Sequence, residues 1–124
     1  MTTQIIRVAI LDDDSSFRTA LGRLLKATGM VVQTYETADQ FFESLSKESP
    51  DCLLLDLQMP GMNGRDVLKY LGQRNISIPT IVITGSGASA CRSYCANAGV
   101  IACLDKPLDA GQLIQTIEGI VGSL

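Results

Sequence analysis

The segment that decides the fold reads Cys52-Leu53-Leu54-Leu55-Asp56. Four consecutive apolar residues that end in a carboxylate are typical of a short strand that is buried on both faces. Strands of this kind belong to parallel sheets that helices cover on both sides. Pro50 lies just before the run and breaks any preceding helix. The segment therefore predicts a central parallel strand over 52–55.

Similar apolar runs recur on both sides of this segment and alternate with amphipathic stretches. Strands are predicted over 5–11, 30–35, 52–55, 80–83 and 100–104. Helices are predicted over 15–28, from 37, from 63 or 64 through 71, over 88–98, and from 109 onward. Five strands that alternate with five helices, (βα)5, predict an α/β fold with one doubly wound parallel sheet and right-handed crossovers.

Residues that begin and end helices support this pattern. Ser15, Thr37 and Asp109 are the predicted N-caps, because their side-chain oxygens can accept bonds from free backbone N–H groups. Gly29 and Gly99 are the predicted stops. The apolar residues expected to face inward are Phe17, Leu21, Leu24, Leu25 and Thr28, then Phe41, Phe42 and Leu45, then Val67, Leu68 and Leu71, and finally Leu113, Ile114, Ile117 and Val121.

Length and composition narrow the class of protein. The chain has 124 residues, 13 acidic and 10 basic side chains, and no histidine, so its net charge is −3. We expect one domain over 1–124 that does not bind nucleic acid directly, since such binding needs an excess of Lys and Arg. The missing histidine excludes His-centred triads and a phosphohistidine on this chain. No apolar run reaches the roughly 18 residues of a membrane span and no signal peptide is recognised, so we expect a cytoplasmic protein that does not contact a membrane.

The cysteines predict a reduced protein. Four cysteines are too few for a disulfide scaffold at this length. Cys52 and Cys103 lie in apolar runs and are expected to be small buried hydrophobic side chains. Cys91 and Cys95 lie four residues apart, but zinc needs four ligands and no histidine is present. A redox role is the alternative.

Polar residues follow four of the predicted strands at the point where each strand ends. These groups are Asp12-Asp13-Asp14, Asp56, Thr84-Gly85 and Asp105-Lys106-Pro107. Any one group could be turn chemistry, helix capping or a solvated charge. Open parallel sheets, however, bind ligands at the carboxyl ends of their strands, where all four groups would converge. The sequence therefore predicts a site at this edge.

The chemistry of these residues suits phosphoryl transfer. Crowded carboxylates repel one another and raise at least one pKa unless a cation is present, and oxygen ligands suit Mg²⁺. Mg²⁺ in proteins is commonly completed by phosphate oxygens, and a carboxylate can itself accept a phosphoryl group as an aspartyl phosphate. The ammonium of Lys106 and the hydroxyl of Thr84 could stabilise the remaining phosphoryl oxygens.

Four blocks in this order resemble the receiver domain of two-component response regulators. They are Val8-Ala9-Ile10-Leu11-Asp12-Asp13-Asp14, residues 53–64 with Asp56-Leu57-Gln58-Met59-Pro60-Gly61-Met62-Asn63-Gly64, Ile83-Thr84-Gly85, and Asp105-Lys106-Pro107. The resemblance runs from about residue 7 to the last helix. It implies a flavodoxin-like fold with strand order 2-1-3-4-5. It also implies a signalling phosphoacceptor that catalyses only its own phosphorylation and dephosphorylation.

The resemblance implies a role for each site residue. Asp56 would be the phosphoacceptor, supplied by a sensor histidine kinase or a phosphotransfer protein. Mg²⁺, or Mn²⁺ in its place, would bind Asp13, Asp56, the backbone carbonyl of Gln58 and, through water, Asp12. The residues expected around the phosphate and its switch are Thr84, Gly85 and Lys106, with a cis bond before Pro107, and with Gln58 and Ser86 tuning the phosphoryl lifetime.

The sequence departs from the family at a few positions and leaves others without a role. Cys103 stands where receivers often carry the aromatic residue of the switch, and Leu108 stands where Phe often follows the Lys-Pro pair. Asp14 has no family role and is interpreted as a loop carboxylate. The basic residues Arg18, Arg23 and Lys26 are interpreted as a solvated helix face.

Alternative functions remain open from the sequence. A phosphatase with an aspartyl nucleophile would need a second Asp where Gln58 stands, and an FMN protein would not place three carboxylates in its phosphate loop. A phosphorylation-independent interaction module is the third alternative. No output domain is visible, so we expect either a stand-alone receiver or one cut from a longer regulator. Homodimerisation through helix 88–98, the last strand and the last helix is an expectation from the family.

Overall fold

The structure is a computed structural model that describes residues 5–59, 61–85 and 99–122. The helix predicted over 88–98 lies outside the described residues, as do Ser86, Cys91 and Cys95. Among the described residues, no helix is both long and apolar enough to span a lipid bilayer.

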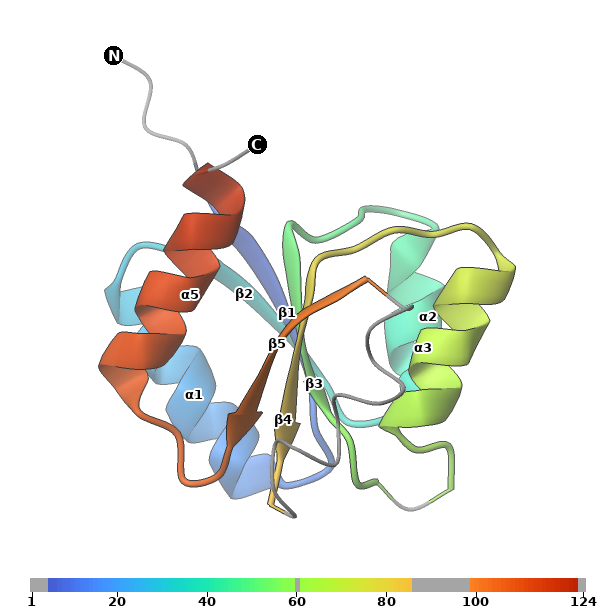
Figure 1. Cartoon of the computed structure of the whole chain (residues 1–124), viewed down its shortest axis with the longest axis horizontal. Coiled ribbons are helices and arrows are strands. Elements are labelled where there is room, and N and C mark those ends of the chain that lie inside the picture. The colour runs from blue at the N-terminus through green and yellow to red at the C-terminus, as the bar shows by residue number, and fades with distance from the viewer. Residues whose placement is uncertain (1–4, 60, 86–98, 123–124) are drawn as a thin grey trace.

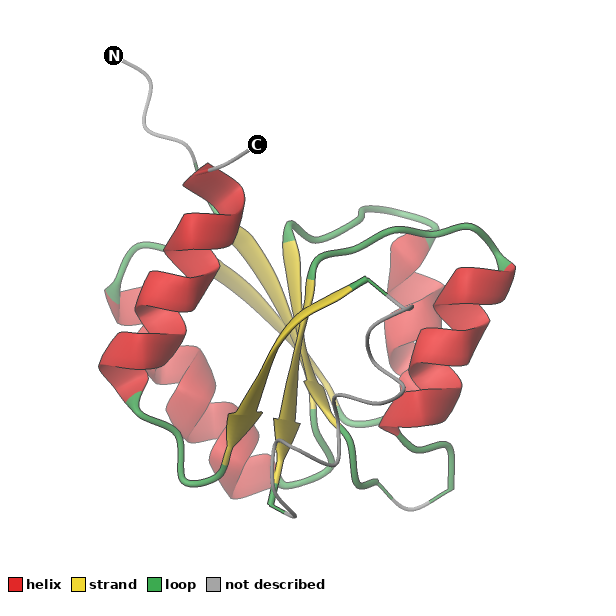
Figure 2. Cartoon of the chain, in the orientation of Figure 1, coloured by secondary structure: helices red, strands yellow, loops and turns green. Residues whose placement is uncertain are grey.

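Five parallel strands form one twisted sheet (Figures 1 and 2). All four strand pairs are parallel and the order is β2-β1-β3-β4-β5, which confirms the predicted doubly wound fold. The strands are β1 (Arg7–Leu11), β2 (Val31–Tyr35), β3 (Cys52–Asp56), β4 (Thr80–Thr84) and β5 (Val100–Asp105). β3 and β4 are buried along their whole lengths, because they lie inside the sheet with helices on both faces.

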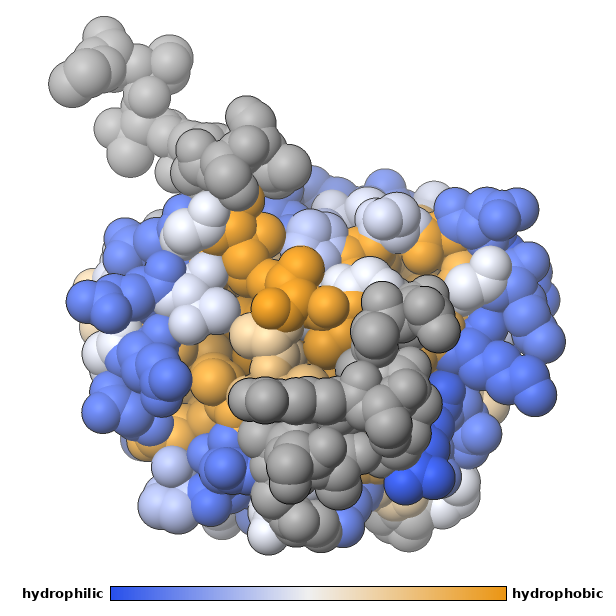
Figure 3. All heavy atoms as spheres, viewed as in Figure 1, coloured by the Kyte–Doolittle hydropathy of each residue, from blue (hydrophilic) through white to orange (hydrophobic). Residues whose placement is uncertain are grey.

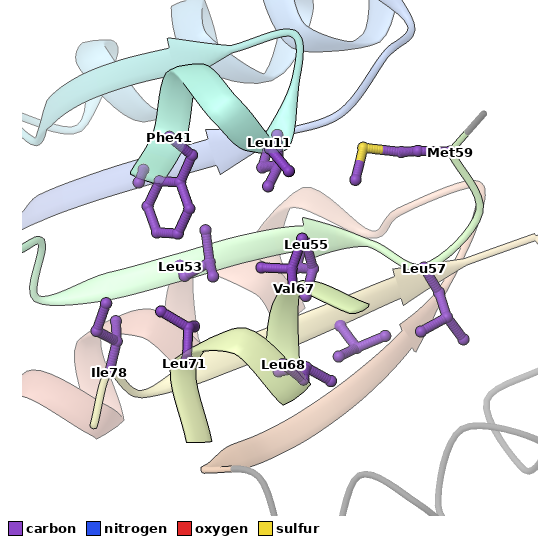
Figure 4. Close-up of a cluster of buried hydrophobic side chains, with 13 residues drawn as sticks. Leu11, Phe41, Leu53, Leu55, Leu57, Met59, Val67, Leu68, Leu71 and Ile78 are labelled. Atoms are coloured by element: carbon purple, nitrogen blue, oxygen red, sulfur yellow. The ribbon is translucent and has the colours of Figure 1, made fainter. Parts of the chain in front are cut away.

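Four described helices cover the sheet, two on each face. α1 (Ser15–Ala27) and α5 (Ala110–Gly122) lie on one face, and α2 (Ala38–Leu45) and α3 (Gly64–Gln73) lie on the other (Figure 1). Each face has its own buried hydrophobic cluster. Figure 4 shows the cluster under α2 and α3, where Phe41, Val67 and Leu71 pack onto the strand residues Leu53 and Leu55. Burial of these side chains is the main favourable term that fixes the helices on the sheet.

The helix starts agree with the sequence at three places and differ at one. Thr37 and Asp109 cap α2 and α5, and Asn63 forms a capping box with Asp66 at the start of α3. The predicted N-cap Ser15 is wrong, because Asp14 takes this role and its Oδ1 accepts a bond from the N–H of Phe17 at 3.1 Å. Both residue types cap helices well, and the sequence alone did not separate neighbouring candidates.

Some predicted boundaries also differ. β1 begins at Arg7, whereas Ile5 is 58% exposed and precedes the strand. Thr28 is exposed and forms the C-cap of α1, where its hydroxyl donates to a backbone carbonyl of the last turn, so it does not belong to the apolar face. Gly29 ends this segment with a φ of +90°, as its residue type predicts.

The edge strand β5 is less buried than β3 and β4. Ile101 is 48% exposed, and Figure 3 shows hydrophobic side chains at the surface over the region of β5 and α5. The two described cysteines also differ. Cys52 is a fully buried free thiol, as predicted, and burial raises its pKa to about 12. The prediction for Cys103 is wrong, because Cys103 is half-buried and disulfide-bonded. The expectation of a fully reduced protein is therefore wrong as well, since the approach of a second sulfur depends on tertiary structure.

Candidate functional site

Four segments meet at the carboxyl edge of the sheet. Asp56 and Thr84 are the last residues of β3 and β4, Asp12 follows β1, and Lys106 follows β5. The ends of β4 and β5 are level because the register pairs Thr84 with Asp105. The parallel order therefore brings together residues that lie far apart in the sequence, as the polar strand ends predicted.

An acidic cluster lies at this edge. Each of Asp12, Asp13 and Asp56 offers a carboxylate oxygen, and these three atoms lie within 4.8 Å of one another. Asp12 and Asp56 are only 1% and 6% exposed, whereas Asp13 is exposed. Carboxylates at this separation repel one another, and oxygen donors of this kind fit a hard divalent cation such as Mg²⁺.

The Asp56 carboxyl group is harder to ionise than an ordinary aspartic acid. Its pKa is raised from 3.8 to about 6, and burial is the largest cause. The backbone N–H of Gln58, which donates to Asp56 Oδ1 at 3.1 Å, lowers the pKa. The charge of Asp12 raises it, that of Lys106 lowers it, and that of Asp13 raises it. The prediction that crowding raises one pKa is confirmed, although burial contributes more than repulsion.

Asp12 is held from three directions. Its Oδ1 accepts a bond from the N–H of Asp14 at 2.9 Å, and its Oδ2 accepts one from Lys106 Nζ at 3.2 Å. Its backbone carbonyl accepts a bond from Arg18 Nη1 at 2.7 Å. These contacts fix the position of the loop that follows β1, because both its carboxylate and its backbone are bonded.

Thr84 and Lys106 are joined through their backbones. The N–H of Lys106 donates to the carbonyl of Thr84 at 2.9 Å, and Thr84 is 1% exposed. Gly85 follows Thr84 and is exposed. The Lys106–Pro107 peptide bond is cis, which is the geometry that the resemblance implies.

Two residues near the acidic cluster were missed as site residues. Phe17 was expected only to pack inward, but its ring also faces Lys106, whose Nζ lies 4.2 Å from the ring centroid. Arg18 was interpreted as part of a solvated face. This interpretation is wrong, because its side chain is only 14% exposed and pairs with the Asp12 carbonyl and, at 3.7 Å, with Glu36. Their positions in the first turn after the three aspartates were the available signal.

A hollow of about 500 Å³ opens beside Asp13. The loop before α2 and the loop after β3 form its walls. The residues that line it are Asp13, Glu36, Thr37, Ala38, Asp39, Met59 and Met62. The acidic cluster is therefore open to solvent on the Asp13 side, while Asp12 and Asp56 are shielded.

Cys103 and Ser86 complete the list of predicted site residues. Cys103 lies inside β5, three residues before Lys106, and packs partly against the cluster under α2 and α3. It therefore stands within the strand and not at its carboxyl edge. Ser86 lies outside the described residues.

Comparison with known sequences identifies the family. The family model of the response regulator receiver domain matches residues 8–118. The DNA-binding transcriptional regulator NtrC of Escherichia coli (strain K12) is 34% identical over 111 residues, which are 90% of this chain and 24% of NtrC. The transcriptional regulatory protein FixJ of Rhizobium meliloti (strain 1021) is 33% identical over 111 residues, which are 90% of this chain and 54% of FixJ. The chain thus spans about a quarter and about half of these two relatives.

Solved structures agree with this assignment. The crystal structure of FixJ-N has a TM-score of 0.87 and 32% identity, and the match covers 98% of each chain. A response regulator receiver protein from Burkholderia phymatum has a TM-score of 0.83 and 36% identity, with 94% of this chain and 95% of that one covered. With its parallel sheet and its acidic cluster, the chain belongs to the response regulator receiver domain family, whose members are signalling phosphoacceptors of two-component systems and not conventional enzymes.

Proposed function

We propose that Asp56 accepts a phosphoryl group from the phosphohistidine of a sensor histidine kinase or a phosphotransfer protein. The observation that carries this proposal is the acidic cluster, in which oxygens of Asp12, Asp13 and Asp56 lie within 4.8 Å beside the ammonium of Lys106. Grouped carboxylates with one fixed cation next to them are suited to bind a metal ion and a phosphoryl group together.

The donors of the cluster fit Mg²⁺, or Mn²⁺ in its place. Asp13, Asp56 and the backbone carbonyl of Gln58 would hold the ion directly. Asp12 would act through water, because both of its carboxylate oxygens already accept bonds from the protein. The bound ion would neutralise charge on the phosphoryl oxygens.

The transfer itself is a nucleophilic substitution at phosphorus. A carboxylate oxygen of Asp56 forms the new P–O bond, and the P–N bond of the donor breaks with its electron pair left on the imidazole. Attack of water on the phosphorus later releases inorganic phosphate and restores the carboxylate. Since the pKa of Asp56 is about 6, most of the population carries the nucleophilic carboxylate at neutral pH.

Thr84, Gly85 and Lys106 would receive the phosphoryl oxygens. The Lys106 ammonium would pair with one oxygen, and the Thr84 hydroxyl and the Gly85 backbone would contact another. Because the N–H of Lys106 is bonded to the carbonyl of Thr84 at 2.9 Å, a shift of Thr84 would be passed to the segment after β5. Gln58 and Ser86 would tune the lifetime of the phosphoryl group.

The output of the domain would lie outside the acidic cluster. Cys103 lacks the ring that commonly moves with the threonine in this family, so Thr84 itself would carry the switch. The exposed apolar residue Ile101 supports a contact with a second copy through the face of β5 and α5. We place the protein in the cytoplasm, where histidine kinases present their phosphohistidines.

The test is intact mass after incubation with acetyl phosphate and Mg²⁺. We expect a gain of one phosphoryl group that is lost with EDTA and with Asp56→Asn. Asp51→Asn is the matched control, because Asp51 directly precedes β3 while Asp56 ends it, and this variant should be phosphorylated normally. If neither acetyl phosphate nor purified kinases with phosphohistidines add a phosphoryl group, the proposal is wrong and the fold serves as a phosphorylation-independent interaction module.

A further inference from the structure

The Lys106 ammonium contacts one charged group and one uncharged aromatic ring. One is the carboxylate of Asp12, whose Oδ2 lies 3.2 Å from Nζ. The other is the ring of Phe17, whose centroid lies 4.2 Å from Nζ. The face of an aromatic ring carries negative electrostatic potential and attracts a cation at this distance.

We propose that Phe17 is a positioning residue, whose ring face holds the Lys106 ammonium at the acidic cluster so that it is ready to pair with a phosphoryl oxygen. The inference rests on the proposed function, because it assigns a role to the lysine of the same site. It makes Phe17 more than a core residue and gives α1 a part in the phosphoryl chemistry.

The structure provides a rigid support for the ring. The N–H of Phe17 donates to Asp14 Oδ1 at 3.1 Å, so its backbone is fixed in the first turn of α1. The inner side of its side chain packs against the hydrophobic cluster beneath α1 and α5. Lys106, in contrast, sits at the end of a four-carbon stem and is 28% exposed, so without a partner its ammonium would sample many positions.

The two partners of Lys106 would behave differently when a phosphoryl group arrives. The Asp12 carboxylate competes with the phosphoryl group, because it neutralises the same ammonium and is also needed near the metal ion. The ring attracts the ammonium but leaves its charge unneutralised and its N–H donors available. Lys106 can therefore exchange Asp12 for a phosphoryl oxygen while its contact with Phe17 persists.

A purely structural role of Phe17 makes a different prediction. A core residue depends on size and shape, whereas a cation–π partner depends on the electron density of the ring. Stepwise fluorination of the ring lowers its attraction for a cation with little change in volume. Site-specific incorporation of mono-, di- and trifluorophenylalanine at residue 17 thus separates the two roles.

The first readout is the second-order rate constant of phosphorylation by acetyl phosphate with Mg²⁺. We expect this constant to fall stepwise along the fluorinated series, by about two- to five-fold in total, which corresponds to a cation–π contact at a partly exposed site. Phe17→Leu should lower the rate constant by a similar factor. Phe17→Trp should keep the rate constant at the wild-type value, because indole binds cations best. The matched control is the same series at Phe42, which stacks on Tyr70 at 3.7 Å on the other face of the sheet and should leave the rate unchanged.

The second readout does not depend on phosphorylation. Because Lys106 Nζ lies 4.2 Å from the ring centroid, we expect the protons on the adjoining ε-carbon to feel the ring current and to resonate upfield in the NMR spectrum. Phe17→Leu should return them to ordinary values, while urea unfolding shows that the variant is folded. If the shift is present but acetyl phosphate and kinases phosphorylate nothing, the proposed function fails and the contact stands. If the wild-type protein is phosphorylated but the rate does not change along the Phe17 series, or changes equally with the Phe42 series, the positioning role is refuted.

Discussion

Gly64 offers the sharpest test of how closely α3 packs against the end of β3, where Asp56, the proposed phosphoacceptor, lies. It is the first residue of α3, and its N–H donates to the carbonyl of Leu57 at 3.1 Å. A β-carbon at this position would lie 2.7 Å from the carbonyl oxygen of Asp56 and 2.7 Å from the α-carbon of Leu57. Both atoms belong to the backbone and have no rotamer to change, so Gly64→Ala must push the start of α3 away from the end of β3.

The expected cost follows from these contacts. Overpacking of this kind destabilises proteins by about 1–3 kcal/mol, and loss of the bond from Gly64 to Leu57 adds about 1 kcal/mol. The higher helix propensity of alanine returns about 0.5–1 kcal/mol. We therefore expect Gly64→Ala to lower the free energy of unfolding by about 2–3 kcal/mol, which is a large part of the total stability of a small domain.

The control lies in the same helix. A β-carbon at Gly72 would have no neighbour within 4 Å, so Gly72→Ala should stabilise the protein by about 0.5–1 kcal/mol through helix propensity alone. Urea unfolding followed by far-ultraviolet circular dichroism measures both variants, since the chain has no tryptophan to serve as a fluorescent probe. If Gly64→Ala is as stable as the wild type, or gains stability as Gly72→Ala does, the argument from close backbone contact is refuted.

Three further predictions concern buried groups. In EDTA, Asp56→Asn should stabilise the protein at about pH 8 by about 1–2 kcal/mol, because the folded-state pKa of Asp56 is about 6, above the ordinary 3.8, so the stability of the wild type falls as the pH rises through this window. Urea unfolding should show that the difference between variant and wild type vanishes below about pH 4, and a difference independent of pH would contradict the assignment. Cys52 should resist iodoacetamide in the folded protein and react in urea, because burial and the charge of Asp51 raise its pKa to about 12. Peptide mass measures the alkylation, and rapid alkylation of the native protein would contradict this prediction. Arg18→Ala should lower the free energy of unfolding by about 1–2 kcal/mol, because it removes the 2.7 Å bond to the Asp12 carbonyl. Glu36→Gln should change it by less than about 0.5 kcal/mol, since the Arg18–Glu36 ion pair is long and Glu36 is exposed. Equal effects of the two variants in urea unfolding would show that the carbonyl contact is not the important one.

The fold could be predicted because its determinants are local. Apolar runs such as Leu53-Leu54-Leu55 predict buried strands. The alternation of these runs with amphipathic stretches predicts parallel strands that are connected by crossover helices. The convergence of Asp12, Asp56 and Lys106 followed from the parallel order, since the carboxyl ends of such strands share one edge. The presence of the acidic cluster was therefore a consequence of topology.

The remaining features depend on side-chain packing that no periodicity reveals. Asp14 and Ser15 are both good capping residues, and only the backbone decides which one stands at the cap. The ring of Phe17 meets Lys106 from a distant part of the chain, and Arg18 turns inward to a carbonyl that the sequence does not display. The disulfide of Cys103 likewise requires two sulfurs to approach in three dimensions.

The most direct test of the central claim is to identify the residue that carries the phosphoryl group. Borohydride reduces an aspartyl phosphate to homoserine, so the modified side chain loses one oxygen and gains two hydrogens relative to aspartate. After incubation with acetyl phosphate and Mg²⁺, peptide mass spectrometry should find this change at Asp56 alone. The same change at Asp12 or Asp13, or its absence from a protein that carries a phosphoryl group, would contradict the assignment of Asp56 as the phosphoacceptor.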